Sequence, residues 1–302
     1  MDDIAVLIPC YNEELTIGKV IKDFAKYLPN AKVYVFDNNS TDRTAEIAKS
    51  LGAIVIKEKR RGKGFVVQSM FSKINAGIYV MVDGDDTYNI SDVASSAAMI
   101  RDEEADMIIG NRLKTHSGRS FRPFHPFGNR LVRFLINRLF KANLKDIMTG
   151  YRIMNNAFVK NINITSSSFE IETEMTIKAL KYGYVIKEVD IGYGERPAGS
   201  FSKLNTLKDG MMVLKTIFII FKEYKPLIFF SSASLILLII SLLSGSVVVE
   251  EFLATRYIRR VPLAIFASGT MILSLVSFVT GVILDSINRR FDELYNYIRN
   301  KA

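Results

Sequence analysis

The chain has very few of the residues that form disulfides or bind zinc. Its 302 residues include one cysteine, Cys10, and two histidines. A single cysteine cannot form a disulfide within the chain, and so small a set of sulfur and imidazole ligands excludes an ordinary zinc site. Cys10 is most simply a small side chain at the end of a strand.

The two common Gly-rich phosphate-binding loops are also absent. No G-x-G-x-x-G follows the first apolar run, Ile4–Ile8, and the chain has no G-x-x-x-x-G-K-[ST]. These absences exclude the dinucleotide-binding fingerprint of dehydrogenases and the P-loop. A nucleotide would have to be held by carboxylates and a metal ion in place of a Gly-rich loop.

The formal net charge of +9 can indicate a nucleic-acid partner. The basic residues, however, concentrate between Arg112 and Arg138 and beside two long apolar segments, where anionic lipid is the simpler partner. No nucleic-acid motif accompanies them. We therefore expect a membrane and no nucleic acid.

Long apolar runs are confined to the last quarter of the chain. Leu227–Val249 and Val261–Leu284 each have the length that crosses a bilayer. The connection between them, Glu250–Arg260, is short and charged. A buried helical pair is the alternative, but a soluble core rarely contains two such runs side by side, so a transmembrane hairpin is favoured.

Basic residues flank both spans on the side to which the chain returns: Lys222 and Lys225 before the first, Arg289 and Arg290 after the second. The positive-inside rule places these ends in the cytoplasm, although three arginines in the connection weaken the signal. We expect a multi-pass protein of the cell membrane with its large N-terminal domain in the cytoplasm.

Residues 1–225 alternate short apolar runs with helical spacings, which predicts an α/β domain with a mainly parallel sheet. The runs predict strands at 4–8, 33–36, 53–56, 78–82 and 107–109, with helices at 15–28, 41–51, 65–74 and around 93–101. Ligands of such sheets bind outside the carboxyl ends of the strands. Pro9–Glu13, Asp37–Ser40 and Asp83–Asp86 all follow strands, so we expect them to face one crevice.

The cluster Asp83-Gly84-Asp85-Asp86 is the most informative of these segments. Crowded carboxylates repel one another unless a cation or hydrogen-bond donors neutralise them. Oxygen ligands on a small turn suit Mg²⁺ or Mn²⁺, which commonly bridge carboxylates to phosphates. The alternative is an ordinary surface turn, because Asp and Gly are common turn residues.

Six motifs in order resemble those of the inverting family 2 glycosyltransferases: Ile8–Glu14, Asp37–Asp42, Gly62–Gly64, Asp83–Asp85, Asp146–Arg152 and Arg196–Lys203. The last two narrow the resemblance to the branch of dolichyl-phosphate mannose synthases and polyprenyl-phosphate glucosyltransferases. It covers roughly residues 3–225. The resemblance implies a GT-A fold and transfer of a sugar, with inversion, from a nucleotide-diphosphate donor to a polyisoprenyl phosphate (dolichyl or undecaprenyl).

The resemblance also implies roles for the strand-end residues. Pro9, Tyr11 and Glu13 match positions that hold the nucleoside, and Asp37 matches the carboxylate that reads the base. Beside it this chain has Asn38 where the family often has a second Asp. Asp83 matches the first acid of the D-x-D motif and Asp85 the principal metal ligand, with Asp86 as a further candidate ligand. Gly84 stands where relatives often carry Ala.

The resemblance also implies roles for several basic residues. Lys63, Arg112, Arg196 and Lys203 match groups that contact the donor diphosphate or the acceptor phosphate. Arg130 is our preferred additional ligand of the acceptor phosphate, ahead of Arg119, Arg122 and Arg133. The alternative for these arginines is a solvated or lipid-facing basic surface. Arg grips a phosphate better than Lys because its donors form a planar fork.

Two stretches have the pattern of basic amphipathic helices that could lie on a membrane. In one, apolar residues from Leu131 to Phe140 interleave with basic residues from Arg130 to Lys141, and the other is Leu204–Tyr224. The alternative for both is a helix packed on the domain core.

Several acids and both histidines have weaker assignments. Asp146 matches a recurring family acid that could orient the acceptor or assist proton removal, and its alternative is a helix or turn cap. Glu170, Glu172 and Glu174 fall where other family members place a base; we expect them to be structural or electrostatic. His116 and His125 are ordinary residues of a loop near Ser117–Pro126.

Three rival functions are less consistent with the chain. A processive polysaccharide synthase would need a Q-x-x-R-W motif, and the chain has no Trp. A sugar nucleotidyltransferase would need a Gly-rich N-terminal loop and has no use for two spans. A non-catalytic adaptor would have no reason to keep the acid cluster. A membrane glycosyltransferase acting on a lipid-linked saccharide or polysaccharide stays as the alternative.

The expected organisation follows: a GT-A domain at 1–203, an interfacial segment at 204–226, spans at 227–249 and 261–284, and a cytoplasmic tail at 285–302. The enzyme would use Mg²⁺ or Mn²⁺. Self-association into a homo-oligomer is left open.

Overall fold

The computed structural model describes residues 3–112, 125–165, 171–194, 196–197, 215 and 218–299. The chain divides into two compact units, Met1–Val213 and Leu214–Ala302. Each unit is considered by itself below.

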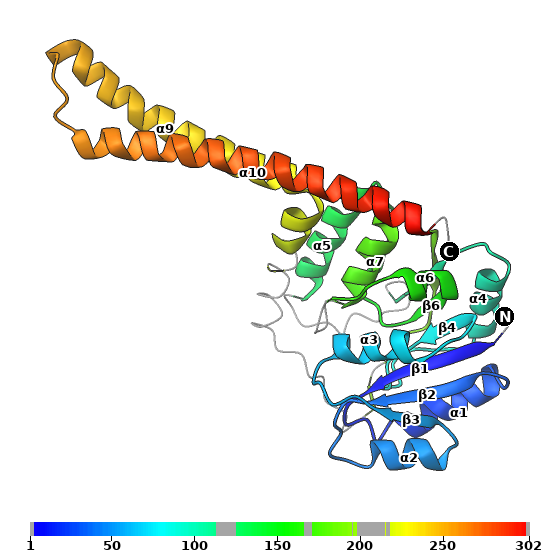
Figure 1. The fold of residues 1–302 in the computed structure, drawn as a ribbon. Helices are drawn as coiled ribbons and strands as arrows, with labels where there is room; N and C mark the ends of the chain where they lie inside the picture. Colours follow the sequence, from blue (N-terminus) through cyan, green and yellow to red (C-terminus); the bar gives the residue numbers. More distant parts are fainter. Residues whose placement is uncertain are drawn as a thin grey trace. The chain divides into compact units, whose positions relative to one another are not determined.

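The described part of the first unit alternates strands and helices, as its sequence pattern predicts (Figure 1). Its strands are β1 Ile4–Cys10, β2 Lys32–Asp37, β3 Ile54–Lys57, β4 Ile78–Met81, β5 Met107–Asn111, β6 Arg152–Asn155 and β7 Ile186–Asp190. Its helices are α1 Ile17–Tyr27, α2 Thr44–Ser50, α3 Lys63–Lys73, α4 Val93–Arg101, α5 His125–Phe140, α6 Asn156–Asn161 and α7 Ile171–Lys181.

The seven strands form one sheet in the order β3-β2-β1-β4-β6-β5-β7. All its pairings are parallel except those of β6, which runs antiparallel to β4 and β5. The predicted α/β fold with a mainly parallel sheet is therefore confirmed. Because β6 runs backwards, its first residue, Arg152, lies beside Met81 and Ile109 at the carboxyl ends of β4 and β5.

Apolar side chains alternate between the two faces of the sheet, as the two-residue period of a strand requires. In β1, Val6 and Ile8 belong to one core cluster, while Ala5 and Leu7 belong to the other. Helices α1, α2 and α4 cover the first face, and α3, α6 and α7 cover the second (Figure 1). A sheet covered on both faces leaves its strand ends as the place for polar groups.

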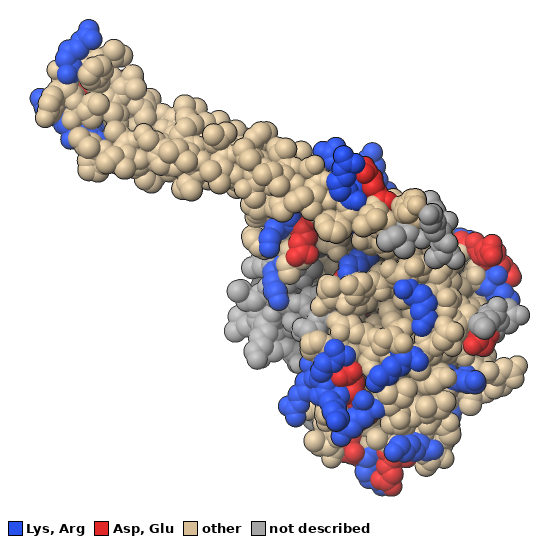
Figure 2. All heavy atoms as spheres, in the orientation of Figure 1, with Lys and Arg blue, Asp and Glu red and all other residues tan. Residues whose placement is uncertain are grey.

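The named elements in the described part of the second unit are a short π-helix, η1 Ile220–Tyr224, and two long helices, α9 Pro226–Thr255 and α10 Val261–Arg299. Both long helices are long and apolar enough to cross a membrane, with mean hydropathies of 2.5 and 2.0. Only 6 % of the apolar window of α9 is buried, which argues against a buried helical pair. Figure 2 shows the uncharged middle of the hairpin, with basic residues at the tip where the helices join.

Serine side chains join the two long helices along their length. The hydroxyls of Ser234 and Ser274 lie 3.0 Å apart, and the Ser241 hydroxyl donates to the Ala267 carbonyl at 2.7 Å. Polar contacts of this kind hold helices together where a bilayer provides no hydrophobic drive between them.

The predicted strands and helices of the first unit differ from the observed ones by up to three residues at each end, and three further segments also differ from the prediction. The connection predicted at Glu250–Arg260 is shorter, because α9 continues to Thr255. The region predicted as a tail at 285–302 is helical up to Arg299, since α10 continues without a break. The loop predicted to reach Pro126 ends earlier, because α5 begins at His125.

Candidate active site

The loops after β1, β2 and β4 each contain one residue in the left-handed conformation. These residues are Asn12, Asn39 and Asp86, with φ of 54°, 64° and 58°. Positive φ is uncommon outside glycine, but Asn and Asp adopt it more readily because their short polar side chains bond locally. Each loop therefore turns back sharply over the same edge of the sheet.

Hydrogen bonds join the first two loops directly. The Asn12 amide donates to the Ser40 hydroxyl at 3.0 Å, and the Thr41 amide donates to Asn12 Oδ1 at 2.8 Å. The Glu13 amide donates to the Thr44 hydroxyl at 2.8 Å. The motifs that contain Pro9, Tyr11, Glu13 and Asp37 thus lie side by side, as expected for one crevice.

The acid turn after β4 is packed against the end of β1. The Thr16 hydroxyl donates to the Gly84 carbonyl at 2.6 Å. A Cβ added at Gly84 would lie 2.7 Å from the buried Cys10 sulfur. Gly84 is therefore required here because Cys10 already fills the space that an alanine methyl would need.

Asn38 organises the neighbouring loop. Its Nδ2 donates to the carbonyls of Glu58 at 3.1 Å and Arg60 at 2.7 Å, and its Oδ1 accepts from the Gly62 amide at 2.9 Å. These bonds hold the loop that leads into Lys63 at the start of α3. An aspartate could not donate these two hydrogen bonds, so the structure itself explains why asparagine occupies position 38.

Each carboxylate of the acid turn is paired with a cation from a different element. The pairs are Asp83 with Lys63 at 2.6 Å, Asp85 with Arg196 at 2.5 Å, and Asp86 with Lys19 at 2.6 Å. Asp85 is buried, and its Oδ1 also accepts from the Thr87 hydroxyl at 2.6 Å. The charge repulsion expected from the sequence is thus relieved by three ion pairs.

No group of three or more Asp, Glu, His or Cys side chains that could hold a metal ion occurs among the described residues. The predicted set of Asp83, Asp85 and Asp86 is therefore not assembled as a cage made of protein alone. Magnesium sites of a different kind need only one or two carboxylates, with substrate phosphates and water completing the shell. The buried Asp85 and the neighbouring Asp83 suit that second kind.

Lys63 connects the acid turn to α7. Its ammonium lies 2.5 Å from Glu172 as well as 2.6 Å from Asp83. Burial lowers the pKa of Lys63, but the two carboxylates outweigh it, so the pKa lies above its ordinary value. Glu172 thus acts electrostatically, while Glu174 pairs with Lys178 at 2.6 Å.

Arg112 and Asp146 form a buried, two-point ion pair. Arg112 Nε lies 2.7 Å from Asp146 Oδ2, and Nη2 lies 3.0 Å from Oδ1. The guanidinium also lies over the Tyr193 ring, 5.3 Å from its centre. Burial lowers the pKa of Arg112, but Tyr88 and Asp146 raise it more, so Arg112 stays charged. Both oxygens of Asp146 serve this pair.

The segment that carries Asp146 also reaches the acid turn. The Gly150 amide donates to the Tyr88 hydroxyl at 2.9 Å, and a Cβ added at Gly150 would collide with the Asp83 carboxylate. Asp83 and Gly150 can therefore approach closely only because Gly150 has no side chain. The acid turn and the segment that carries Asp146 are therefore neighbours in this structure.

Sequence reasoning assigned no role to Arg152, which is wholly buried. Its Nη2 donates to the carbonyls of Ile147 at 2.7 Å and Glu172 at 2.8 Å, and to the Thr176 hydroxyl at 2.9 Å. Burial lowers the pKa of Arg152 to about 10. The sequence feature that could have indicated a role for Arg152 is its position next to the apolar residues Ile153 and Met154.

Arg130 is exposed on α5, whereas Val132 and Ile136 on the same helix are buried. The helix therefore packs on the first unit with one face and presents Arg130, Phe134 and Arg138 on the other. The predictions for Arg119, Arg122, Lys203, Glu170 and His116 lie outside the described residues.

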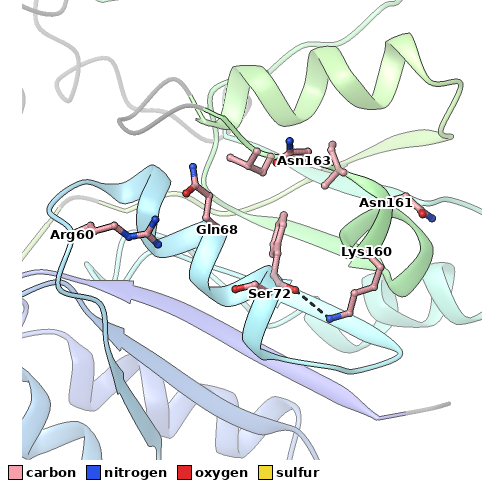
Figure 3. A pocket seen from close by; sticks show the side chains of 9 residues that line it. Arg60, Gln68, Ser72, Lys160, Asn161 and Asn163 are labelled. Atoms are coloured by element: carbon pink, nitrogen blue, oxygen red, sulfur yellow. Dashed lines mark hydrogen bonds between the residues drawn. The ribbon is translucent and has the colours of Figure 1, made fainter. Parts of the chain in front are cut away.

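A separate cavity of about 580 Å³ lies between α3 and the segment from α6 to Ile164 (Figure 3). Gln68 and Asn163 lie on opposite sides of it, and Lys160 donates to the Phe71 and Ile74 carbonyls at the end of α3. None of the predicted site residues lines this cavity. It is therefore distinct from the predicted site at the carboxyl ends of the strands.

Residues 5–162 match the family model described as Glycosyl transferase family 2. The chain belongs to glycosyltransferase family 2. Glycosyltransferase AglJ of Haloferax volcanii is 32 % identical over 232 residues, covering 76 % of each chain. A dolichyl-phosphate hexose transferase of the same organism is 32 % identical over 216 residues, covering 72 % of this chain and 92 % of its own.

The fold of this glycosyltransferase is also shared with solved structures. Glucosyl-3-phosphoglycerate synthase from Mycobacterium tuberculosis, crystallised with Mn²⁺, UDP and phosphoglyceric acid, superposes with a TM-score of 0.60. The match covers 73 % of this chain and 78 % of the synthase at 18 % identity, so it concerns the fold alone. The predicted GT-A fold and the predicted enzyme class are both confirmed.

Gly84→Ala should destabilise the glycosyltransferase by about 1–3 kcal/mol, because its methyl would meet the Cys10 sulfur in a packed site. Urea unfolding of the detergent-solubilised protein measures the loss. Adding Cys10→Ala should recover most of it. Equal losses with and without Cys10→Ala would show that the sulfur is not the obstacle.

Asn38→Asp should cost about 1–3 kcal/mol, because the carbonyls of Glu58 and Arg60 lose the Asn38 donor and face a carboxylate oxygen. Hydrogen exchange at the Gly62 amide should also become faster, because the loop opens more often once those carbonyls are released, although the new carboxylate can still accept from this amide. Asn30→Asp, at an exposed turn, is the matched control and should leave both measurements unchanged. Unchanged exchange at Gly62 in Asn38→Asp would contradict the structural role.

Proposed function

We propose that this glycosyltransferase transfers a sugar from a UDP- or GDP-sugar to a polyisoprenyl phosphate, with inversion at the anomeric carbon. The observation that carries the proposal is the contact between the buried Asp85 and Arg196 at the carboxyl edge of the sheet. In this pair, a carboxylate that could bind a metal ion lies beside a guanidinium group that could bind a diphosphate. The dolichyl-phosphate hexose transferase among the relatives supports the same acceptor class.

The donor is assigned to the loops after β1, β2 and β4. Pro9, Tyr11, Glu13 and Asp37 would hold the nucleoside, and Lys63 with Arg196 would hold the diphosphate. Asn38 and Gly84 shape this crevice through the contacts described above. Tyr11 is 39 % exposed, which leaves its ring accessible to a bound base.

Mg²⁺ or Mn²⁺ would be held by Asp85, with Asp83 as the second carboxylate. The Mn²⁺ and UDP bound to the Mycobacterium synthase support a divalent ion in this fold. Such an ion supplies a Lewis acid for the negative charge that develops on the leaving diphosphate. Asp86 is the weakest of the three proposed ligands, because its carboxylate faces Lys19 on α1.

The acceptor phosphate is assigned to Arg112, with Arg130 as a second contact. A phosphate monoester has a second pKa near ~6 and is largely ionised at neutral pH, so it needs positioning more than a strong base. Asp146 fits this requirement, since both of its oxygens hold Arg112. We therefore propose Asp146 as a positioning residue and not as the group that removes a proton.

We propose that α9 and α10 anchor the enzyme in the cell membrane with the first unit on the cytoplasmic side. The basic residues that flank the spans support this orientation. The proposed division places the catalytic domain at 1–203, a juxtamembrane segment at 204–226 and the two spans within α9 and α10. The exposed Arg130, Phe134 and Arg138 would suit an anionic lipid surface.

The direct test is a screen of UDP- and GDP-sugars against a short-chain polyprenyl phosphate, with Mg²⁺ or Mn²⁺, using the full chain in nanodiscs. We expect one nucleotide sugar to give a glycosyl phospholipid of inverted anomeric configuration, read by mass spectrometry and NMR. Transfer only to a lipid-linked saccharide would replace this acceptor with the alternative one. No transfer to any lipid acceptor would contradict the proposal.

Asp85→Ala should lower sugar transfer by on the order of a thousandfold while the protein stays folded and membrane-bound. The reason is that Asp85 would be the principal metal ligand. Asp86→Asn is the matched comparison within the same turn, because asparagine tolerates the positive φ of this position. Its loss should be much smaller, since the carboxylate of Asp86 is directed to Lys19. Retained activity in Asp85→Ala would refute the metal role.

A further inference from the structure

The segment Leu144–Thr149, which carries Asp146, is held by side chains from three elements. Asn137 on α5 bonds the backbone of Leu144 in both directions, at 2.9 and 3.0 Å. Arg152 at the start of β6 donates to the Ile147 carbonyl at 2.7 Å. The third element is β7, and its contribution is a carboxylate.

Glu188 on β7 accepts hydrogen bonds from two consecutive backbone amides, those of Lys145 and Asp146. Its Oε1 lies 2.7 Å from the Lys145 nitrogen and 2.9 Å from the Asp146 nitrogen. Glu188 is paired with Ile109 of β5, three residues before Arg112. One carboxylate therefore links β7, the Asp146 turn and the end of β5.

The electrostatic surroundings of Glu188 do not favour its charged form. Burial raises the pKa of Glu188, and the nearby charge of Asp146 adds to this, although the two amides lower it. For a carboxyl group whose pKa is raised in the folded state, the charged form contributes less to stability as the pH rises above the ordinary pKa. The charge of Glu188 is therefore not favoured by its surroundings at neutral pH, and its clearest contacts are the two hydrogen bonds to the Asp146 turn.

We propose that Glu188 is a positioning residue for the acceptor phosphate. It fixes the turn that carries Asp146, Asp146 fixes the Arg112 guanidinium at two points, and Arg112 binds the phosphate of the acceptor lipid. The last step rests on the proposed function. The first two are contacts of 2.7–3.0 Å in the structure.

The test compares three single variants of the full chain in nanodiscs. Glu188→Ala should raise the KM for a short-chain polyprenyl phosphate by about tenfold and leave the KM for the nucleotide sugar unchanged, since only the acceptor side is displaced. Glu188→Gln should recover most of the affinity, because one Oε1 can accept both amides. Glu104→Ala is the matched control: Glu104 pairs with Lys187, the β7 neighbour of Glu188, at the surface.

A double-mutant cycle separates positioning from general stability. If Glu188 acts through Asp146, then Glu188→Ala should add little to the KM of an Asp146→Asn variant. Additive effects, or equal increases in both KM values, would overturn the positioning role. So would an acceptor KM in Glu188→Ala that matches that of Glu104→Ala.

Direct binding of the short-chain polyprenyl phosphate, by calorimetry without donor, distinguishes the two levels of the proposal. No binding by the unmodified protein would contradict the proposed function and the role of Glu188 with it. Binding by the unmodified protein that Glu188→Ala leaves unchanged would contradict the role of Glu188 alone. Weaker binding in Glu188→Ala, restored in Glu188→Gln, is the expected result.

Discussion

Three carboxylates within four residues impose the constraint on which the rest of this structure depends. Asp83, Asp85 and Asp86 follow β4 directly, and like charges so close together are stable as anions only beside cations. The three cations come from α1, from the first residue of α3 and from the segment after β7. The acid turn therefore requires three parts of the chain that are remote in sequence to bring their cations to it. These cations lie at the edge of the sheet where the polar loops meet.

The same principle of matched, partly buried pairs extends beyond the acid turn. Lys63 is shared between Asp83 and Glu172, and Arg112 is held by Asp146 at two points. Removing one member of such a pair leaves a buried charge without compensation, which is far more destabilising than the loss of a surface ion pair. Each charged side chain in the site is thus held in place by a partner of opposite charge. At Gly84 and Gly150 the backbone approaches neighbouring side chains too closely for a Cβ atom, and this close approach brings the paired groups together.

Sequence reasoning succeeded where a pattern is local and failed where a contact is distant. Runs such as Ile78–Val82 predicted their strands because a sheet covered on both faces needs continuous apolar residues. β6 was missed, since it begins with Arg152, whose charge is solvated by carbonyls that only the folded chain brings near. Asn38 stands where the family often has a second Asp, yet its amide is occupied by a loop some twenty residues away. The contacts of Lys63 with Asp83 and Glu172, and of Glu188 with the Asp146 turn, could not be predicted, because the partners are far apart in the sequence.

Charge balance also shows how a site built of ion pairs could accommodate the metal ion and the diphosphate of the proposed function. Without a ligand, the carboxylates of the acid turn are neutralised by Lys63, Arg196 and Lys19. A divalent cation bound to a doubly charged diphosphate ester adds no net charge to such a site. In the proposed complex, Asp85 and Asp83 would hold the metal ion while Lys63 and Arg196 would hold the phosphates, so each of these charges would keep a partner of opposite sign. A bare metal ion would offer the displaced cations no new partners. On this proposal the metal ion and the diphosphate would be accommodated together, which is the arrangement that one or two carboxylates, and not a closed protein cage, can serve.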